Sequence, residues 1–266
     1  MKAMDFEYDG LRLSDFGYML CNFDGGGMDT VEMGSTISFN TIPTLNGFKY
    51  ELTSAAYEDC LTATLQICKN HCSGNQDLLE MSVDDIRNLM RWLNRKNFHK
   101  FKLIDTDYAS IYFEASFNVS KIEIDGRVYG LELEMTTNRP FAMQEPVIIK
   151  INNDKPGVVR KFSSNSDEDG FIYANMKIEI KQGGDLVIKG ITENRTTVIK
   201  NCKAGEVITI DYPVIKSSLD SHKIQNDFNW IFFRVNTTFK DMNNEFTASL
   251  PCVITITYSP IAKVGI

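Results

Sequence analysis

Four residues of the types that bind zinc lie close together in the front half of the chain: Cys60, Cys68, His71 and Cys72. Structural zinc sites usually draw their ligands from closely spaced pairs. The spacing here is C-x₇-C-x₂-H-C, and residues 61–67 alternate between apolar and polar side chains, as a β-strand does. A strand of that length would hold Cys60 and Cys68 about 25 Å apart. We therefore predict that the chain binds no metal.

Acidic and histidine side chains are the next candidates for chemistry. Asp105 and Asp107 lie near the start of a predicted strand, and residues 167–169 (Asp-Glu-Asp) lie in a predicted loop. A glycosidase needs two carboxylates at a fixed separation across a sugar, which their spacing does not define. Solvated loop charge is the commoner role of such residues. His99 and His222 have no partner motif, so we assign them no role.

The known catalytic motifs are missing from the sequence. It contains no G-x-S-x-G, no H-E-x-x-H and no G-x-x-x-x-G-K-[ST]. The run Gly25-Gly26-Gly27 lacks the spacing of a phosphate-binding loop and is typical of a flexible connector. The sequence therefore predicts a protein that is not an enzyme and binds no cofactor.

Composition and charge restrict the class of partner. The 266 residues are 43% hydrophobic and 24% charged, as in a folded domain. Residues 1–144 hold 13 Lys and Arg against 21 Asp and Glu, which argues against a nucleic-acid partner. Charges stand where a signal peptide would have its apolar region, and no apolar run approaches the roughly 20 residues of a membrane span. We expect synthesis in the cytoplasm without a signal peptide, and no membrane partner.

Most of the chain shows the period-two pattern of β-strands. Residues 108–119 alternate strictly, and Asp125-Gly126 separates two such runs, which is a hairpin signal. One helix is predicted, capped by Ser82, with an apolar stripe of Val83, Ile86, Leu89, Met90 and Leu93 and with Arg91, Arg95 and Lys96 near its far end. Trp92 lies beside this stripe and must pack against its own domain or a neighbouring subunit.

Proline-containing segments at 138–140 and 144–146 interrupt the pattern, so we place a domain boundary there, with domains 1–142 and 143–266. Short strands separated by turn residues are predicted in the second domain at 147–151, 171–181, 186–191, 207–210, 230–235 and 252–258. Such spacing is typical of a β-sandwich or jelly roll. The fold class is therefore mainly β, with an α+β first domain.

Several tracts, in a fixed order, carry a family resemblance. They are Phe6-Glu7-Tyr8-Asp9-Gly10-Leu11 with residues 13–18, Asn88-Leu89-Met90-Arg91-Trp92-Leu93 with residues 100–105, residues 122–135, residues 205–211 and residues 252–260. Together they resemble the distal tail (baseplate hub) protein family of siphophages over nearly the whole chain. The tract 217–229 does not follow the family pattern.

The resemblance implies a split-barrel-like first domain that forms a hexameric ring, single or stacked, and a galectin-like β-sandwich as second domain. In this family the ring joins the tail tube protein to the tail-associated lysin or fibre protein, and receptor-binding proteins dock on it. It implies a place at the virion tail tip. Within such a ring, Trp92 is our candidate for part of the subunit interface.

Two other functions remain open. The second domain could be a carbohydrate-binding module for host cell-wall sugars, which needs an exposed aromatic platform. Trp230 lies in the apolar run Trp230-Ile231-Phe232-Phe233, which is typical of a core strand and argues against such a platform. The other is a jelly-roll glycosidase, which paired carboxylates would have to support.

Overall fold

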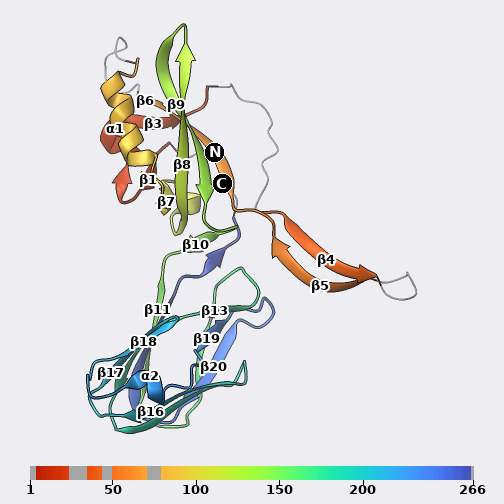
Figure 1. The fold of residues 1–266 in the computed structure, drawn as a ribbon, viewed down its shortest axis with the longest axis vertical. Coiled ribbons are helices and arrows are strands. Elements are labelled where there is room, and N and C mark those ends of the chain that lie inside the picture. Colours follow the sequence, from red (N-terminus) through yellow and green to blue (C-terminus); the bar gives the residue numbers. More distant parts are fainter. Residues whose placement is uncertain (1–3, 24–34, 44–49, 71–78, 265–266) are drawn as a thin grey trace. The chain divides into compact units, whose positions relative to one another are not determined.

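The computed structural model describes residues 4–23, 35–43, 50–70 and 79–264 of the chain. Residues up to Gln144, together with those from Lys263 on, form one compact unit, and Glu145–Ala262 forms a second. We call them unit 1 and unit 2 and describe each by itself (Figure 1). Both are built mainly from antiparallel strands, which confirms the predicted fold class.

Unit 1 is organised around one antiparallel sheet with the strand order β2-β1-β7-β8-β9-β6-β3, while β10 pairs with β8. The elements are β1 (Phe6–Tyr8), β2 (Leu11–Arg12), the 3₁₀ turn η1 (Leu13–Phe16), β3 (Tyr18–Cys21), β6 (Thr62–Lys69), α1 (Val83–Leu93), β7 (His99–Leu103), η4 (Thr106–Tyr108), β8 (Ile111–Ile124), β9 (Arg127–Thr137) and β10 (Ala142–Gln144). A separate two-stranded hairpin consists of β4 (Ile37–Pro43) and β5 (Tyr50–Tyr57).

The predicted hairpin between β8 and β9 is confirmed, and its turn shows why. Asp125 and Gly126 both adopt positive φ, 52° and 77°, as the central residues of a type I′ turn must. Aspartate and glycine are among the few residues that accept this conformation at low cost. The turn pairs Ile124 with Arg127, and a register shift between Ile122 and Glu123 then pairs Phe117 with Met135 and Val119 with Leu133.

Helix α1 is confirmed together with its Ser82 cap, but its apolar stripe differs at one position. The Ser82 side chain accepts a hydrogen bond from the Asp85 N–H at 3.1 Å, and Asp85 Oδ2 accepts one from the Ser82 N–H at 2.9 Å, which is a capping box. Burial raises the pKa of Asp85, but hydrogen bonds from Lys69 and Ser82 outweigh it and lower the pKa to about 2. Val83 was wrongly placed in the stripe: among the described residues it is 82% exposed. Trp92 is buried instead.

Unit 2 is a β-sandwich of a five-stranded sheet (β11-β21-β14-β17-β18) and a four-stranded sheet (β12-β20-β15-β16), with β13 and β19 as a separate pair. The elements are β11 (Val147–Asn153), β12 (Arg160–Ser163), β13 (Phe171–Tyr173), β14 (Asn175–Ile180), β15 (Gly184–Gly190), β16 (Arg195–Cys202), β17 (Val207–Asp211), β18 (Val214–Ser217), α2 (Ile224–Asp227), β19 (Arg234–Asn236), β20 (Asn243–Ala248), β21 (Cys252–Tyr258) and β22 (Ile261–Ala262).

The core of unit 2 is one cluster to which both sheets contribute. Ile178 and Ile254 of the five-stranded sheet and Ile188 and Phe246 of the four-stranded sheet are all fully buried within it. Strand β21 alternates strictly between buried and half-buried residues, as a strand with one face on a core must. The helices α1 and α2, with 11 and 4 residues, fall short of the length that a membrane-crossing helix needs.

The predicted strand at 230–235 is wrong over most of its length. Strand β19 covers only Arg234–Asn236, and Trp230 is 52% exposed with φ of 59°. A positive φ is incompatible with a strand. The side chain of Asn229 holds the turn, because its Oδ1 accepts hydrogen bonds from the Val198 N–H (3.1 Å) and the Ile231 N–H (3.2 Å).

That the two units are separable domains, with a boundary between residues 142 and 143, stays a prediction. Linkers expose their backbone to proteases more than packed strands do. Limited digestion should therefore cut first within residues 140–146 and leave an N-terminal fragment of about 16 kDa by residue share. First cuts that all fall inside one unit would contradict the two-domain organisation.

Candidate subunit interface

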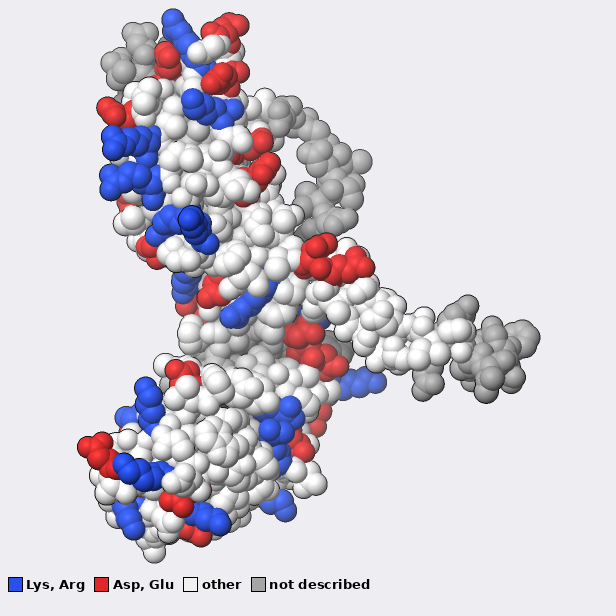
Figure 2. Space-filling view, in the orientation of Figure 1, with Lys and Arg blue, Asp and Glu red and all other residues white. Residues whose placement is uncertain are grey.

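The hairpin of β4 and β5 carries an apolar face that nothing in the described chain covers. Its strands pair only with each other among the described residues. Ile37 and Phe39 share one face because they are two residues apart, and Leu52 joins them because it pairs with Thr41. These three side chains are 46%, 62% and 55% exposed. Figure 2 shows the hairpin almost free of charged side chains.

The opposite face of the hairpin carries the polar residues Ser38, Asn40 and Ser54 together with Ile42, which is 58% exposed. Asn40 Nδ2 donates to Ser54 Oγ at 3.0 Å, and Ser38 Oγ donates to the Ala56 carbonyl at 3.3 Å. A two-stranded hairpin on its own is marginally stable in water, and a sheet with one apolar face is stabilised by burying that face. The hairpin thus has the form of a binding element whose partner lies outside the described chain.

Trp92, the predicted interface residue, packs inside unit 1. Its ring stacks on Phe16 (4.6 Å between centroids) and on Phe6 (5.8 Å), and its Nε1–H donates to the Tyr8 carbonyl at 3.0 Å. The residue is 7% exposed. The sequence left open whether Trp92 packs against its own domain or a neighbouring subunit, and its own domain provides most of the contact. A role at a subunit interface stays a prediction, limited to the ring edge that remains accessible.

That edge opens into a shallow pocket of about 390 Å³ beside helix α1, lined in part by Leu11, Phe16, Trp92, Arg91 and Arg95. Leu11 and Phe16 are 47% and 41% exposed, so the pocket has an apolar floor. Lys and Arg side chains gather over the region of α1 in Figure 2. The pocket is therefore an apolar depression bordered by Arg91 and by the ion pair of Arg95 with Asp9, whose charged atoms are 2.9 Å apart.

The four residues considered as zinc ligands do not form a cluster among the described residues. Cys60 is exposed ahead of β6, and Cys68 lies near the other end of that strand, as the spacing predicted. Cys68 interacts instead with Cys21 of β3, and a hydrogen bond between the two thiols lowers the pKa of Cys68 to about 7. His71, Cys72 and the Gly25–Gly27 run lie outside the described residues. The absence of a bound metal stays a prediction.

The acidic groups singled out in the sequence shape the local backbone. Asp105 caps η4 by accepting a hydrogen bond from the Asp107 N–H at 3.1 Å. Asp169 Oδ1 accepts one from the Phe239 N–H at 3.1 Å. His99 lies 3.5 Å from Asp9 and packs edge-on against the ring of Tyr8. These contacts give each group a structural role.

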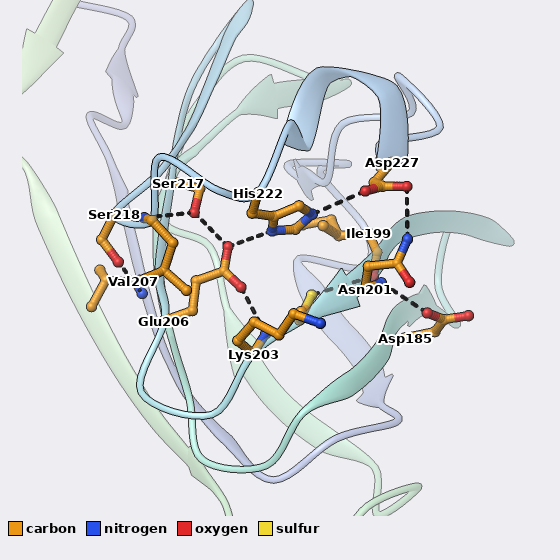
Figure 3. A network of polar contacts seen from close by, with 12 residues as sticks. Asp185, Ile199, Asn201, Lys203, Glu206, Val207, Ser217, Ser218, His222 and Asp227 are labelled. Carbon is orange, nitrogen blue, oxygen red and sulfur yellow. Dashed lines mark hydrogen bonds and ion pairs between the residues drawn. The ribbon is translucent and has the colours of Figure 1, made fainter.

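A buried polar network in unit 2 is the other cluster with the residue types of a catalytic site (Figure 3). The fully buried Glu206 accepts hydrogen bonds from Ser217 Oγ (2.5 Å) and the Lys203 N–H (2.8 Å), and lies 2.6 Å from His222 Nδ1. Burial raises the pKa of Glu206, but the hydrogen bonds from Ser217, Lys203 and His222 outweigh it and lower the pKa below its usual value.

This network lacks the geometry of a Ser-His-acid triad. In a triad the hydroxyl donates to the imidazole, which acts as the base, whereas Ser217 donates to the carboxylate. The other imidazole nitrogen of His222 lies 3.3 Å from Asp227 at the end of α2. The network instead ties the tract 217–229, which departs from the family pattern, to the turn before β17. The sequence offered no signal for it, because its members are 11 and 16 residues apart.

The hairpin was also missed, although its signal is present. Residues 37–42 and 50–57 show partial alternation and are separated by a loop with the dipeptide Asn46-Gly47, which favours a hairpin. The dipeptide Asn46-Gly47 is thus a local signal in the sequence for this hairpin.

Comparison with known proteins agrees with this architecture. A family model described as "Phage tail protein N-terminal domain" matches residues 1–139, and one described as "Phage tail C-terminal domain" matches residues 141–258. No curated protein matches the chain. The crystal structure of the phage SPP1 Dit (gp 19.1) protein, called a paradigm of the hub adsorption apparatus in Gram-positive infecting phages, has a TM-score of 0.68 at 11% identity, covering 97% of this chain and 99% of that one. The chain therefore belongs to the phage tail protein family and shares the fold of a Dit protein, in agreement with the resemblance found in its sequence.

Proposed function

We propose that the chain is a structural subunit of a phage tail tip that closes into a hexameric ring. The ring joins the tail tube protein to the tail-associated lysin or fibre protein and offers docking sites to receptor-binding proteins. The observation that carries the proposal is the uncovered apolar face of the β4–β5 hairpin, with Ile37, Phe39 and Leu52 exposed. The family match and the Dit fold support the place in the tail.

A closed ring needs two different patches on each subunit, because every contact is heterologous. The hairpin face supplies one patch. The pocket beside α1, with Leu11, Phe16 and the edge of Trp92, supplies the second. Both lie in unit 1, and both are apolar enough to gain free energy on burial. In the proposed ring the hairpin of one subunit covers the pocket of the next, which gives Trp92 its interface role.

Native mass spectrometry of the purified chain at micromolar concentration, with electron microscopy of the same sample, tests this proposal. We expect a six-fold species, or a multiple of six for stacked rings, with a central channel. Tail proteins can require their neighbours to close, so the same measurement is repeated with the tube and fibre proteins present. A chain that stays monomeric under both conditions overturns the ring.

A further inference from the structure

Unit 2 presents a row of aromatic side chains that the ring does not use. Tyr173 and Tyr212 stack face to face, with 3.9 Å between centroids and 10° between planes. Tyr212 and Trp230 both contact the ring of Phe232, at 5.1 and 6.4 Å. Phe232 is buried, whereas Tyr173, Tyr212 and Trp230 are 38%, 47% and 52% exposed. We call these three exposed residues the aromatic row.

A charged pair closes one end of the row. The guanidinium of Arg234 lies 4.3 Å from the centroid of Phe171 and 5.9 Å from that of Tyr173. Its Nε–H donates to both carboxylate oxygens of Glu193, at 3.1 and 3.2 Å. Strand β13, the turn after β17, the loop before β19 and β19 itself all contribute to this surface. Segments far apart in the sequence thus converge on it.

The conformation of Trp230 is the second observation. Its φ of 59° is rare for a bulky side chain and costs free energy. The amide of Asn229 maintains it, since Nδ2 donates to the Thr196 carbonyl at 2.9 Å while Oδ1 accepts from two backbone N–H groups. A strained backbone that displays a half-exposed indole points to use of that indole in binding.

The size of the row indicates the class of ligand. A stable protein partner covers about 800 Å² on each side. Each large aromatic side chain can bury about 150–250 Å², so Phe171 and the aromatic row, roughly half exposed, offer roughly 400 Å². These four side chains alone therefore supply about half of one side of such an interface, which favours a ligand smaller than a protein. A glycan chain is narrow, and its sugar rings present C–H faces that stack on aromatic rings and hydroxyl groups that bond to guanidinium, carboxylate and amide groups.

We propose that the aromatic row binds a polysaccharide of the bacterial cell surface, with the guanidinium of Arg234, which Glu193 holds in place, bonding to sugar hydroxyls. The sequence argued against this function because it placed Trp230 in a core strand. The exposure of Trp230 removes that objection. The proposal does not depend on the hexameric ring, because every residue of the site lies in unit 2.

The test is a sedimentation assay of the full chain with purified cell walls, carrying their polysaccharides, from the strain that propagates the phage. We expect retention of the wild type, and an apparent Kd at least about tenfold weaker for Trp230→Ala and for Tyr173→Ala. Phe239→Ala is the matched control: Phe239 is 78% exposed in unit 2 and lies outside the row, so its loss should leave binding unchanged. Soluble polysaccharide released from the same walls should compete.

Trp230→Gly is the control for misfolding, because glycine accepts the positive φ at low cost. We expect this variant to keep or raise the unfolding temperature and still to lose binding to the cell walls. Failure of the wild type to sediment with these walls overturns the proposal, and so does binding that Trp230→Ala leaves intact. If Trp230→Ala instead weakens binding of a tail protein, the row is a protein docking site. Native mass spectra of the same variants separate this outcome from failure of the ring.

Discussion

Replacing Phe39 and Leu52 together by aspartate is expected to leave a folded chain that no longer forms rings. Each side chain is more than half exposed in the single chain, so the substitutions cost little in the isolated subunit. In the ring, burial of the exposed part of each side chain contributes about 1–2 kcal/mol. Loss of both weakens every subunit contact by roughly 10–10³-fold. Native mass spectrometry and sedimentation should then show a monomer where the wild type assembles.

The matched control introduces the same charges on the opposite face of the same hairpin. Ser38→Asp with Ser54→Asp adds two carboxylates to the strands that carry Phe39 and Leu52, but on the side where Asn40 and Ser54 bond to each other. This variant should keep the assembly state of the wild type. If the Phe39 and Leu52 variant assembles like the wild type, the hairpin face is not the interface.

Truncation of Trp92 has the second large effect, and it is an effect on folding. The indole packs on Phe6 and Phe16 and donates a hydrogen bond to the Tyr8 carbonyl, so Trp92→Ala leaves a cavity and removes that hydrogen bond. Such truncations cost about 3–5 kcal/mol. Chemical denaturation, performed at concentrations where the wild type is monomeric, should show this loss in the free energy of unfolding of unit 1.

Val83→Ala on the same helix is the control, because Val83 is 82% exposed and surface changes of this kind stay within about 0.5 kcal/mol. The experiment also separates two roles of Trp92. If the variant unfolds like the wild type as a monomer but fails to assemble, Trp92 acts only at the interface. If the monomer instead loses stability, Trp92 acts mainly by packing within unit 1.

Local interactions explain the elements that were predicted well. The start of α1 follows from Ser82 and Asp85, three residues apart, whose reciprocal hydrogen bonds form within one turn. The β8–β9 hairpin follows from Asp125-Gly126, because this dipeptide accepts the two positive φ angles of a tight turn. The family was inferred from the order of several sequence tracts, because no single motif among them is specific to it.

Trp230 shows where local pattern fails. An apolar run predicts burial whichever backbone conformation it adopts. In the run Trp230-Ile231-Phe232-Phe233, however, Phe232 and Phe233 are buried whereas Trp230 is exposed. The choice rests on Asn229, whose amide bonds to strand β16. That strand is about thirty residues away in the sequence, so a pattern of neighbouring residues cannot indicate this hydrogen bond.

The mainly-β class, the long helix with its cap, the tight hairpin turn and the family can be predicted from the residues alone, because each rests on contacts between near neighbours or on an ordered set of tracts. Which apolar faces are covered depends on tertiary packing. Trp92 is enclosed by rings from β1 and η1, the hairpin face of Phe39 and Leu52 is left open, and the aromatic row is displayed. The physical reason is that alternation identifies a strand's two faces, whereas burial depends on which distant segments pack against them.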